Sequence, residues 1–149
     1  HRQISPRHVS ISLQYLLSRE DGGCAKIINA YVMDQDRDTF DLDIIFTEKN
    51  TAIGTINATA DISDANMEAI GLCGMCRFKT DVAFIGGIDQ VRLLRWSEMV
   101  ADSERTSAGP ILIQAETGSK SVYVSGIFSS GTPTFAAADD MDIILHIEK

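Results

Sequence analysis

Apolar and polar side chains alternate along most of this chain. The clearest case begins a stretch at residues 39–71, where Phe40, Leu42 and Ile44 alternate with acidic residues. This period of two is typical of a strand with one buried and one hydrated face, although Ile45 interrupts the polar face. Because the pattern recurs in several segments, most of the chain has to fold as sheet.

One segment departs from this pattern and has the features of a two-turn helix. Asp61 or Ser63 is suited to cap its N-terminus by accepting backbone N–H groups, and Gly71 suits the left-handed residue that ends a helix. Met67 and Ile70 lie three positions apart and share one face. We expect that face to pack on the sheet.

The remaining segments predict a sandwich of antiparallel strands. Strand patterns occur at residues 9–17, 25–33, 39–46, 73–78, 81–85, 88–96, 110–115, 121–128 and 141–147. Turn residues separate these segments at short intervals, as in all-β sandwiches. We therefore predict an all-β fold: a jelly-roll-like β-sandwich of about eight antiparallel strands, with one short helix near residues 62–70. Residues 9–149 form its single domain, and residues 1–8 are an N-terminal arm.

The polar segment between two of these strands predicts a hairpin. Residues 25–33 are apolar on both faces and so belong in a central strand. Asp34, Asp36 and Asp38 alternate as in a calcium loop, but the glycine and glutamate positions of that loop fall on Thr39 and Ile45. We interpret the segment as a solvated turn that pairs its two flanking strands.

Charge and hydropathy exclude several classes of partner. The 149 residues have a formal net charge of −8, which disfavours binding to nucleic acid or to anionic membranes. The sequence has no apolar run long enough for a transmembrane helix. We expect neither nucleic acid nor membrane as a partner.

The three cysteines do not form a convincing metal or redox motif. Cys73 and Cys76 have C-x-x-C spacing, but a structural zinc site needs further ligands, and the three histidines are distant in sequence. The pair follows a helix, whereas redox pairs open one. With Cys24, the number is odd for a disulfide framework. We predict reduced, partly buried structural cysteines and no metal.

No catalytic or cofactor motif is present either. The sequence has no G-x-S-x-G nucleophile elbow, no phosphate-binding glycine loop and no H-x-H pair. Aromatic residues make up only 7% of the chain, fewer than sugar-binding sandwiches usually use for stacking. We therefore predict a protein that is not an enzyme and that holds no cofactor.

The order of segments resembles a group of small virion structural proteins of tailed bacteriophages. The resemblance rests on residues 40–46 (FDLDIIF), 62–65 (ISDA), 70–71 (IG), 131–135 (GTPTF) and 140–143 (DMDI). It is a likeness of strand and turn pattern, and it carries no catalytic residues. It implies a jelly-roll-like capsid decoration, or cement, protein, made in the host cytoplasm and placed on the outer capsid surface. Such proteins commonly form trimers that clamp neighbouring major capsid subunits.

Three segments are candidates for contact with the shell or with other subunits: the arm at residues 1–8, the loop at residues 97–109 and the tip at residues 129–138. Within or near them, Arg2, Arg7, Trp96 and Phe135 are the candidate contact residues. Each also has a simpler interpretation. The arm can be a frayed terminus, Trp96 can be a packing residue, and Phe135 can be buried in its own core.

Two other functions remain open. One is a small viral coat protein or a tail or fibre head domain with the same fold. The short arm and the acidic composition argue against a coat protein that packages nucleic acid. The other is a soluble sandwich that binds a carbohydrate or a receptor, which the low aromatic content disfavours.

Overall fold

The structure is a computed structural model that describes residues 7–9, 15–16, 21–36, 38–51, 53–55, 62–79, 92–97, 110–131, 133–135 and 140–149; for residues 7–9, 15–16 and 92–97 it describes the backbone alone. Its strands are β1 (Arg7–Val9), β2 (Tyr15–Leu16), β3 (Cys24–Asp34), β4 (Phe40–Thr47), β5 (Leu72–Phe78), β6 (Arg92–Ser97), β7 (Ile111–Gln114), β8 (Ser121–Gly131) and β9 (Met141–Glu148). The one helix among these residues is α1 (Asp64–Ala69).

The predicted all-β class is confirmed. The segments predicted as strands at residues 25–33, 39–46, 73–78, 110–115, 121–128 and 141–147 correspond to β3, β4, β5, β7, β8 and β9. Strand β6 covers the second part of the strand predicted at residues 88–96. The strand predicted at residues 81–85 lies outside the described residues.

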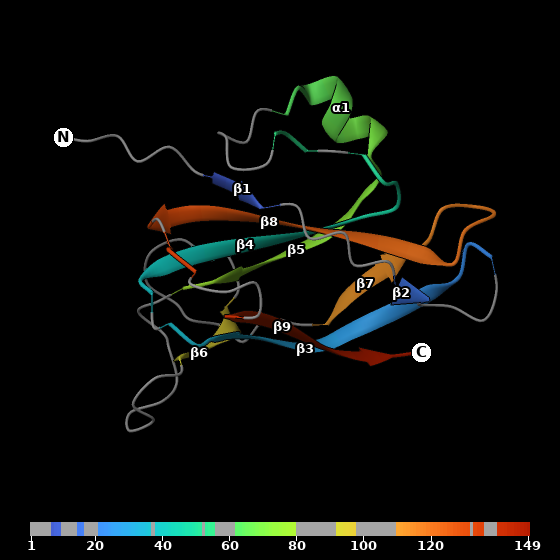
Figure 1. The fold of residues 1–149 in the computed structure, drawn as a ribbon. Coiled ribbons are helices and arrows are strands. Elements are labelled where there is room, and N and C mark those ends of the chain that lie inside the picture. Colours follow the sequence, from blue (N-terminus) through green and yellow to red (C-terminus); the bar gives the residue numbers. More distant parts are fainter. Residues whose placement is uncertain are drawn as a thin grey trace.

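The strands form two layers (Figure 1). In one layer β4 lies between β5 and β8, and the short strands β1 and β2 pair with the other edge of β8. In the other layer β3 pairs with β9 on one edge and with β6 and β7 on the other. Strand β6 also pairs with β5, so it joins the two layers along one side. All of these pairs are antiparallel.

Apolar side chains from both layers meet in one core. The alternating residues of β4 supply Phe40, Leu42, Ile44 and Phe46, each at most 1% exposed. The members contributed by the other strands are Ala25, Ile27, Ala30, Val32, Cys76, Phe78, Ile113, Val122, Val124 and Phe128, with Ala115 next to β7. The period-two pattern directs these side chains inward as the sequence predicts. Two expectations about the opposite faces are wrong: the other face of β4 is not hydrated, since Asp43 and Thr47 are buried, and β3 buries only one of its faces.

The predicted hairpin between β3 and β4 is wrong. The two strands lie in different layers, and neither has the other as a ladder partner. After β3 the chain turns away from its own sheet, where the backbone N–H of Gln35 donates to the carbonyl oxygen of Asp140 at 2.8 Å. The two strands have apolar inner faces that pack against each other through the core, which side-by-side pairing would not allow.

The residue that ends β8, opposite the start of β4, has to be a glycine. Gly131 has φ +76°, and a Cβ atom there would clash with the backbone oxygen of Thr39. No L side chain fits this approach without moving backbone. The end of β8 is therefore held directly against the segment that enters β4.

Helix α1 covers part of the outer face of the β4 layer, as the sequence predicts. Ser63 is the N-cap and accepts from the backbone N–H of Asn66 at 3.3 Å, while Gly71 follows the helix with φ +63°. Ile70 is fully buried and Met67 partly buried against Ile45 of β4, in a second small cluster. The apparent interruption of the polar face at Ile45 is therefore the site on which the helix packs.

A charged pair lies on the same side of β4. The guanidinium group of Arg77 on β5 donates two hydrogen bonds of 2.6 Å to the two carboxylate oxygens of Asp43. The side chain of Asp43 is 10% exposed, so little water competes for this bidentate contact. The hydrogen bonding to Asp43 raises the pKa of Arg77. The pair links β4 and β5.

Candidate interaction surface

The β3–β9 layer presents a mixed apolar and polar face to solvent. We call this the outer face and define it by Ile28 and Tyr31 of β3, Leu112 of β7, and Ile144 and His146 of β9. Three of these are large apolar side chains with high exposure: Ile28 at 52%, Leu112 at 58% and Ile144 at 39%. Exposed apolar side chains gathered on one sheet mark a surface that binds other molecules more often than a catalytic centre.

Polar groups at the centre of the outer face are held by local contacts. The side-chain amide of Asn29 donates to the hydroxyl oxygen of Tyr31 at 2.6 Å, and its Oδ1 accepts from the backbone N–H of Ala30 at 2.9 Å. The ring of Tyr31 packs edge-on against His146, with centroids 5.5 Å apart. The aromatic pair therefore has a defined orientation before any partner binds, which lowers the entropic cost of binding.

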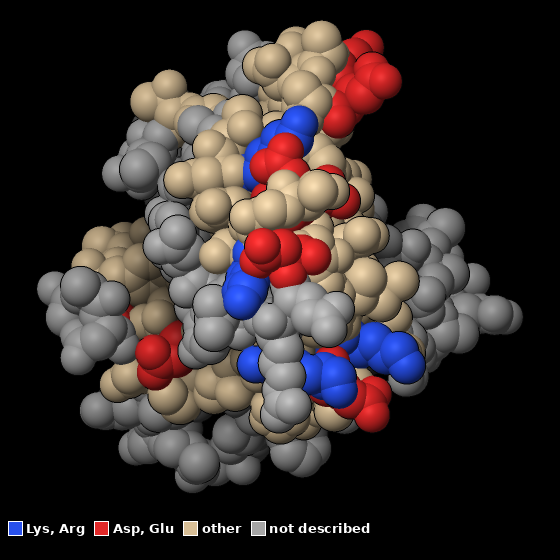
Figure 2. Space-filling view, turned by 90° about the vertical axis from the view of Figure 1, so that its right-hand side faces the viewer, with Lys and Arg blue, Asp and Glu red and all other residues tan. Residues whose placement is uncertain are grey.

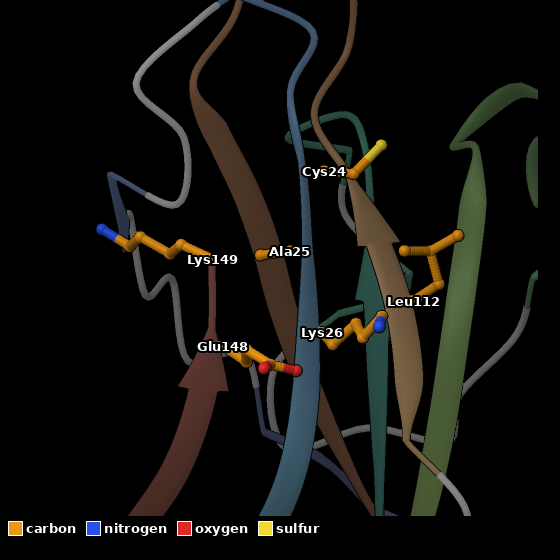
Figure 3. Close-up of a pocket in the computed structure, with 6 residues that line it drawn as sticks. All are labelled: Cys24, Ala25, Lys26, Leu112, Glu148 and Lys149. Carbon is orange, nitrogen blue, oxygen red and sulfur yellow. The ribbon is translucent and has the colours of Figure 1, made fainter.

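A shallow hollow of about 270 Å³ lies at one end of this face. Lys26 lies opposite Leu112 of β7 and opposite Glu148 of β9, and Cys24 and Lys149 complete the rim. Figure 3 shows that these side chains point in different directions, with the thiol of Cys24 and the amine of Lys149 directed apart. The groups do not converge on one point, as a small-molecule site would require.

The described residues contain no arrangement with metal-binding chemistry. Among them, no group of three or more His, Cys, Asp or Glu side chains lies close enough to hold a metal ion. Within the same ranges, no helix has the length and apolar character needed to cross a membrane.

The three cysteines are unpaired thiols in three environments, and the prediction that they are partly buried is wrong for Cys24. Cys24 is exposed, Cys73 is half-buried and Cys76 is buried in the core. Burial raises the pKa of Cys73, whose thiol donates to the carbonyl oxygen of Gln114 at 3.4 Å. Burial raises the pKa of Cys76 further, with a smaller contribution from Asp43. Cys73 and Cys76 are therefore protonated at neutral pH, which lowers their reactivity because the thiolate is the nucleophile.

Two of the candidate contact residues are separated by the fold. Arg7 lies in β1 opposite Phe128 of β8, and Trp96 lies in β6 opposite Phe78 of β5, with β8, β4 and β5 between the two strands in the sheet order. Arg2 lies outside the described residues. Arg7 and His8, which were assigned to the arm, take part in the β1–β8 ladder. The loop at residues 97–109 lies outside the described residues beyond the end of β6.

The fourth, Phe135, belongs partly to the core. Its ring centroid lies 6.2 Å from that of Phe40 and 6.0 Å from that of Phe128. The side chain is half-buried and packs against the main cluster. Of the two interpretations drawn from the sequence, burial in its own core describes much of the ring, while its remaining exposed part keeps a contact role as a prediction.

Charges are mixed on the side of the molecule that carries the β7–β8 turn. Figure 2 shows basic and acidic side chains in small neighbouring groups, with no broad area of one sign. Two exposed ion pairs join the described residues near this turn, Lys49 with Glu116 at 3.7 Å and Lys120 with Asp21 at 4.0 Å. Screened pairs of this kind contribute little to stability.

The outer face was not found from the sequence, although part of it was visible there. In the alternation of residues 141–147, Ile144 and His146 share the face that also carries Asp142, but Tyr31 lies 115 positions before His146 and no local pattern joins the two. The signal that could have identified this face is an apolar residue at a position whose neighbours on both sides are also apolar.

Comparisons of the chain with protein-family models, with curated proteins and with solved structures gave no match.

Proposed function

We propose that this chain is a virion structural protein that decorates the outside of a phage head and clamps neighbouring major capsid subunits. The proposal takes its protein class from the likeness of segment order described above. The observation that supports it is the outer face, which carries the exposed Ile28, Leu112 and Ile144 and the Tyr31–His146 pair on one side of a sheet. A cement protein needs such a contact surface and no catalytic group.

The strand pairing supports a jelly-roll-like fold. Strand β3 pairs with β9, and β4 pairs with β8, so the inner pair is nested within the outer pair along the chain. Nested pairs folded over into two layers are typical of a jelly roll. In this chain the next strand, β5, pairs with the other edge of β4 and so extends the layer beside it. We propose a jelly-roll-like sandwich with this extension.

The test is co-sedimentation of the purified protein with phage heads stripped of accessory proteins. We expect saturable binding at a fixed ratio to the major capsid protein, because the assembled shell offers a fixed number of sites. A protein that binds only the assembled shell also stabilises that shell by mass action. The ratio also gives the number of chains per site, for which the resemblance implies three. No binding to stripped heads from the native phage would contradict the proposal. Assembly of the protein alone into closed particles would indicate a coat protein instead.

Matched variants locate the contact. The double variant Ile28→Asp, Leu112→Asp places charge on the outer face and should weaken shell binding by roughly a hundredfold, as loss of central apolar contacts does in other interfaces. Leu72→Asp is the control, since Leu72 is 46% exposed but lies on β5 in the other layer. Equal loss in both variants would place the contact elsewhere or indicate misfolding, which circular dichroism would distinguish.

A further inference from the structure

The edge of β9 that faces away from β3 has no partner strand among the described residues. Strand β9 forms a ladder with β3 alone, over Met141 to Glu148. Figure 1 shows it beside β3 in the lower layer. A strand edge eight residues long carries a row of backbone N–H and C=O groups able to pair with another chain.

The features that usually block such an edge are absent from β9. Its sequence, MDIILHIE, has no lysine and no proline, and its charged residues stand near its ends. The register irregularity in its ladder comes from the β3 side, between Ile27 and Asn29. By contrast, the strands on the far edge of the other layer, β1 and β2, are only 3 and 2 residues long. Monomeric proteins protect long edges with charge, proline or bulges.

The inner side of β9 also leaves apolar surface uncovered. Met141, Ile143, Leu145 and Ile147 pack on the core, but all four remain only half-buried. The inward residues of the neighbouring β3 are fully buried. The core is therefore incompletely covered along this edge.

We infer that two copies of this chain pair through their β9 strands, antiparallel and about a two-fold axis at Ile144. This register places Asp142 opposite His146 of the second copy, twice, so that each carboxylate can accept an imidazole N–H. Ile144 meets its own copy on the outer side, and Ile143 meets Leu145 on the inner side. An isologous contact of this kind is self-complementary.

Neighbouring registers are worse. Centring the pair on Leu145 places Asp142 opposite Glu148 within the ladder and removes both Asp142–His146 contacts, and like charges directly opposite each other destabilise a ladder. Centring it on Ile144 brings like charges together only at the two ends, where Asp140, which precedes β9, comes opposite Glu148. A register shifted by one residue pairs the inner, apolar side chains of one β9 strand with the outer, more polar side chains of the second β9 strand. The sequence of β9 therefore favours one pairing. It does not depend on the proposed capsid role, and it predicts a dimer in solution, whereas the resemblance implies a trimer.

The first test is the mass of the free protein by sedimentation velocity across a concentration series. We expect a two-chain species that Ile144→Lys converts to monomer, raising the dissociation constant roughly tenfold or more. Leu112→Lys is the matched control, because Leu112 is exposed on the same face but lies on β7, away from the edge. A monomer throughout the series, or a three-chain species, would overturn the β9 pairing.

Cross-linking tests the register itself. In a Cys24→Ser background, Ile144→Cys should form an intermolecular disulfide on mild oxidation, because residues directly opposite have Cβ atoms about 5 Å apart. Glu148→Cys is the control. In the inferred register its copy lies eight residues away, roughly 27 Å, so it should stay reduced. Cross-linking through Glu148→Cys and not through Ile144→Cys would contradict this register, whatever the outcome with phage heads.

Discussion

The three cysteines differ in their exposure to water. Cys24 is exposed on β3, Cys73 is half-buried on β5, and Cys76 lies within the core with 2% exposure. Burial favours the neutral thiol, so it raises the pKa of both β5 cysteines. A thiol that stays protonated and enclosed is a packing group, which is the role the sequence predicted.

Thiol labelling should follow this order of exposure. We expect iodoacetamide at neutral pH to modify Cys24 first and Cys73 more slowly. Cys76 should react at least about a thousandfold more slowly than Cys24, because it becomes accessible only when the whole domain unfolds. Mass spectrometry of peptides after timed labelling measures the three rates. Equal rates for Cys24 and Cys76 would contradict the placement of Cys76 in the core, and labelling in denaturant provides the control.

The raised pKa of Cys76 also makes stability depend on pH in one direction. The folded-state pKa lies above the ordinary value of 9.0, so the contribution of the thiol is complete below that value. This stabilising contribution is lost as the pH rises above 9.0, because only the unfolded chain then releases the thiol proton. The Cys76→Val variant lacks this thiol. Its free energy of unfolding, measured by denaturant titration, should therefore fall less above about pH 9 than that of the original protein. An unchanged decline would mean that other groups cause it.

Among the elements, α1 depends most on local sequence. Its cap, its closing glycine and its buried face all follow from residues within the helix or next to it, and all were predicted correctly. What the helix covers was not visible locally. Ile45 interrupts the polar face of β4, and only the folded structure shows that Ile70 packs on it.

Removal of the cap should weaken this element measurably. Ser63→Ala leaves one N–H group of the first turn without its side-chain acceptor and should lower the free energy of unfolding by about 1 kcal/mol. Ser63→Asp should retain stability, because its carboxylate also accepts and suits the positive end of the helix dipole. Chemical denaturation of the three proteins measures both effects. Equal loss in both variants would show that the cap hydrogen bond is unimportant.

Strand positions were predictable from sequence, and strand partners were not. Apolar patterning records which side chains are buried, and it predicted β3, β4, β5 and β9 to within one residue at each end, while β8 runs three residues further than predicted. It carries no information on which strand lies alongside. The acidic segment between β3 and β4 looked like a hairpin turn, yet it crosses between layers. The outer face was missed for the same reason, since Tyr31 meets His146 only through the β3–β9 pairing.

Across the whole molecule, each layer is held by one strand pair of long sequence separation, β3–β9 in one layer and β4–β8 in the other. Each joins strands that are distant in the chain, and β9 covers one whole edge of β3 from Lys26 to Asp34. Without β9, the inner face of β3 would lose the packing of Ile143, Leu145 and Ile147. The stability of the sandwich is therefore concentrated in contacts of long sequence separation.

Deletion of residues 141–149 should abolish cooperative unfolding, because it exposes the β3 edge together with part of the core. Thermal melts followed by near-ultraviolet circular dichroism measure this loss, and deletion of Lys149 alone is the control. A synthetic peptide of residues 141–149 should restore the transition in trans, since it can pair with the open edge. A cooperative melt of the shortened chain without the peptide would contradict the structural role of β9.

The separation of β3 from β9 has a consequence during synthesis. About a hundred residues lie between the end of one strand and the start of the other. At about 5–20 residues per second, β3 waits on the order of ten seconds before its partner emerges from the ribosome. For that interval an apolar strand is present with one edge open in a crowded polysome, where neighbouring nascent chains carry the same strand. Translation speed over this interval thus sets how long each chain is exposed to wrong pairing, and synonymous codons there can alter the yield of folded protein without changing a residue.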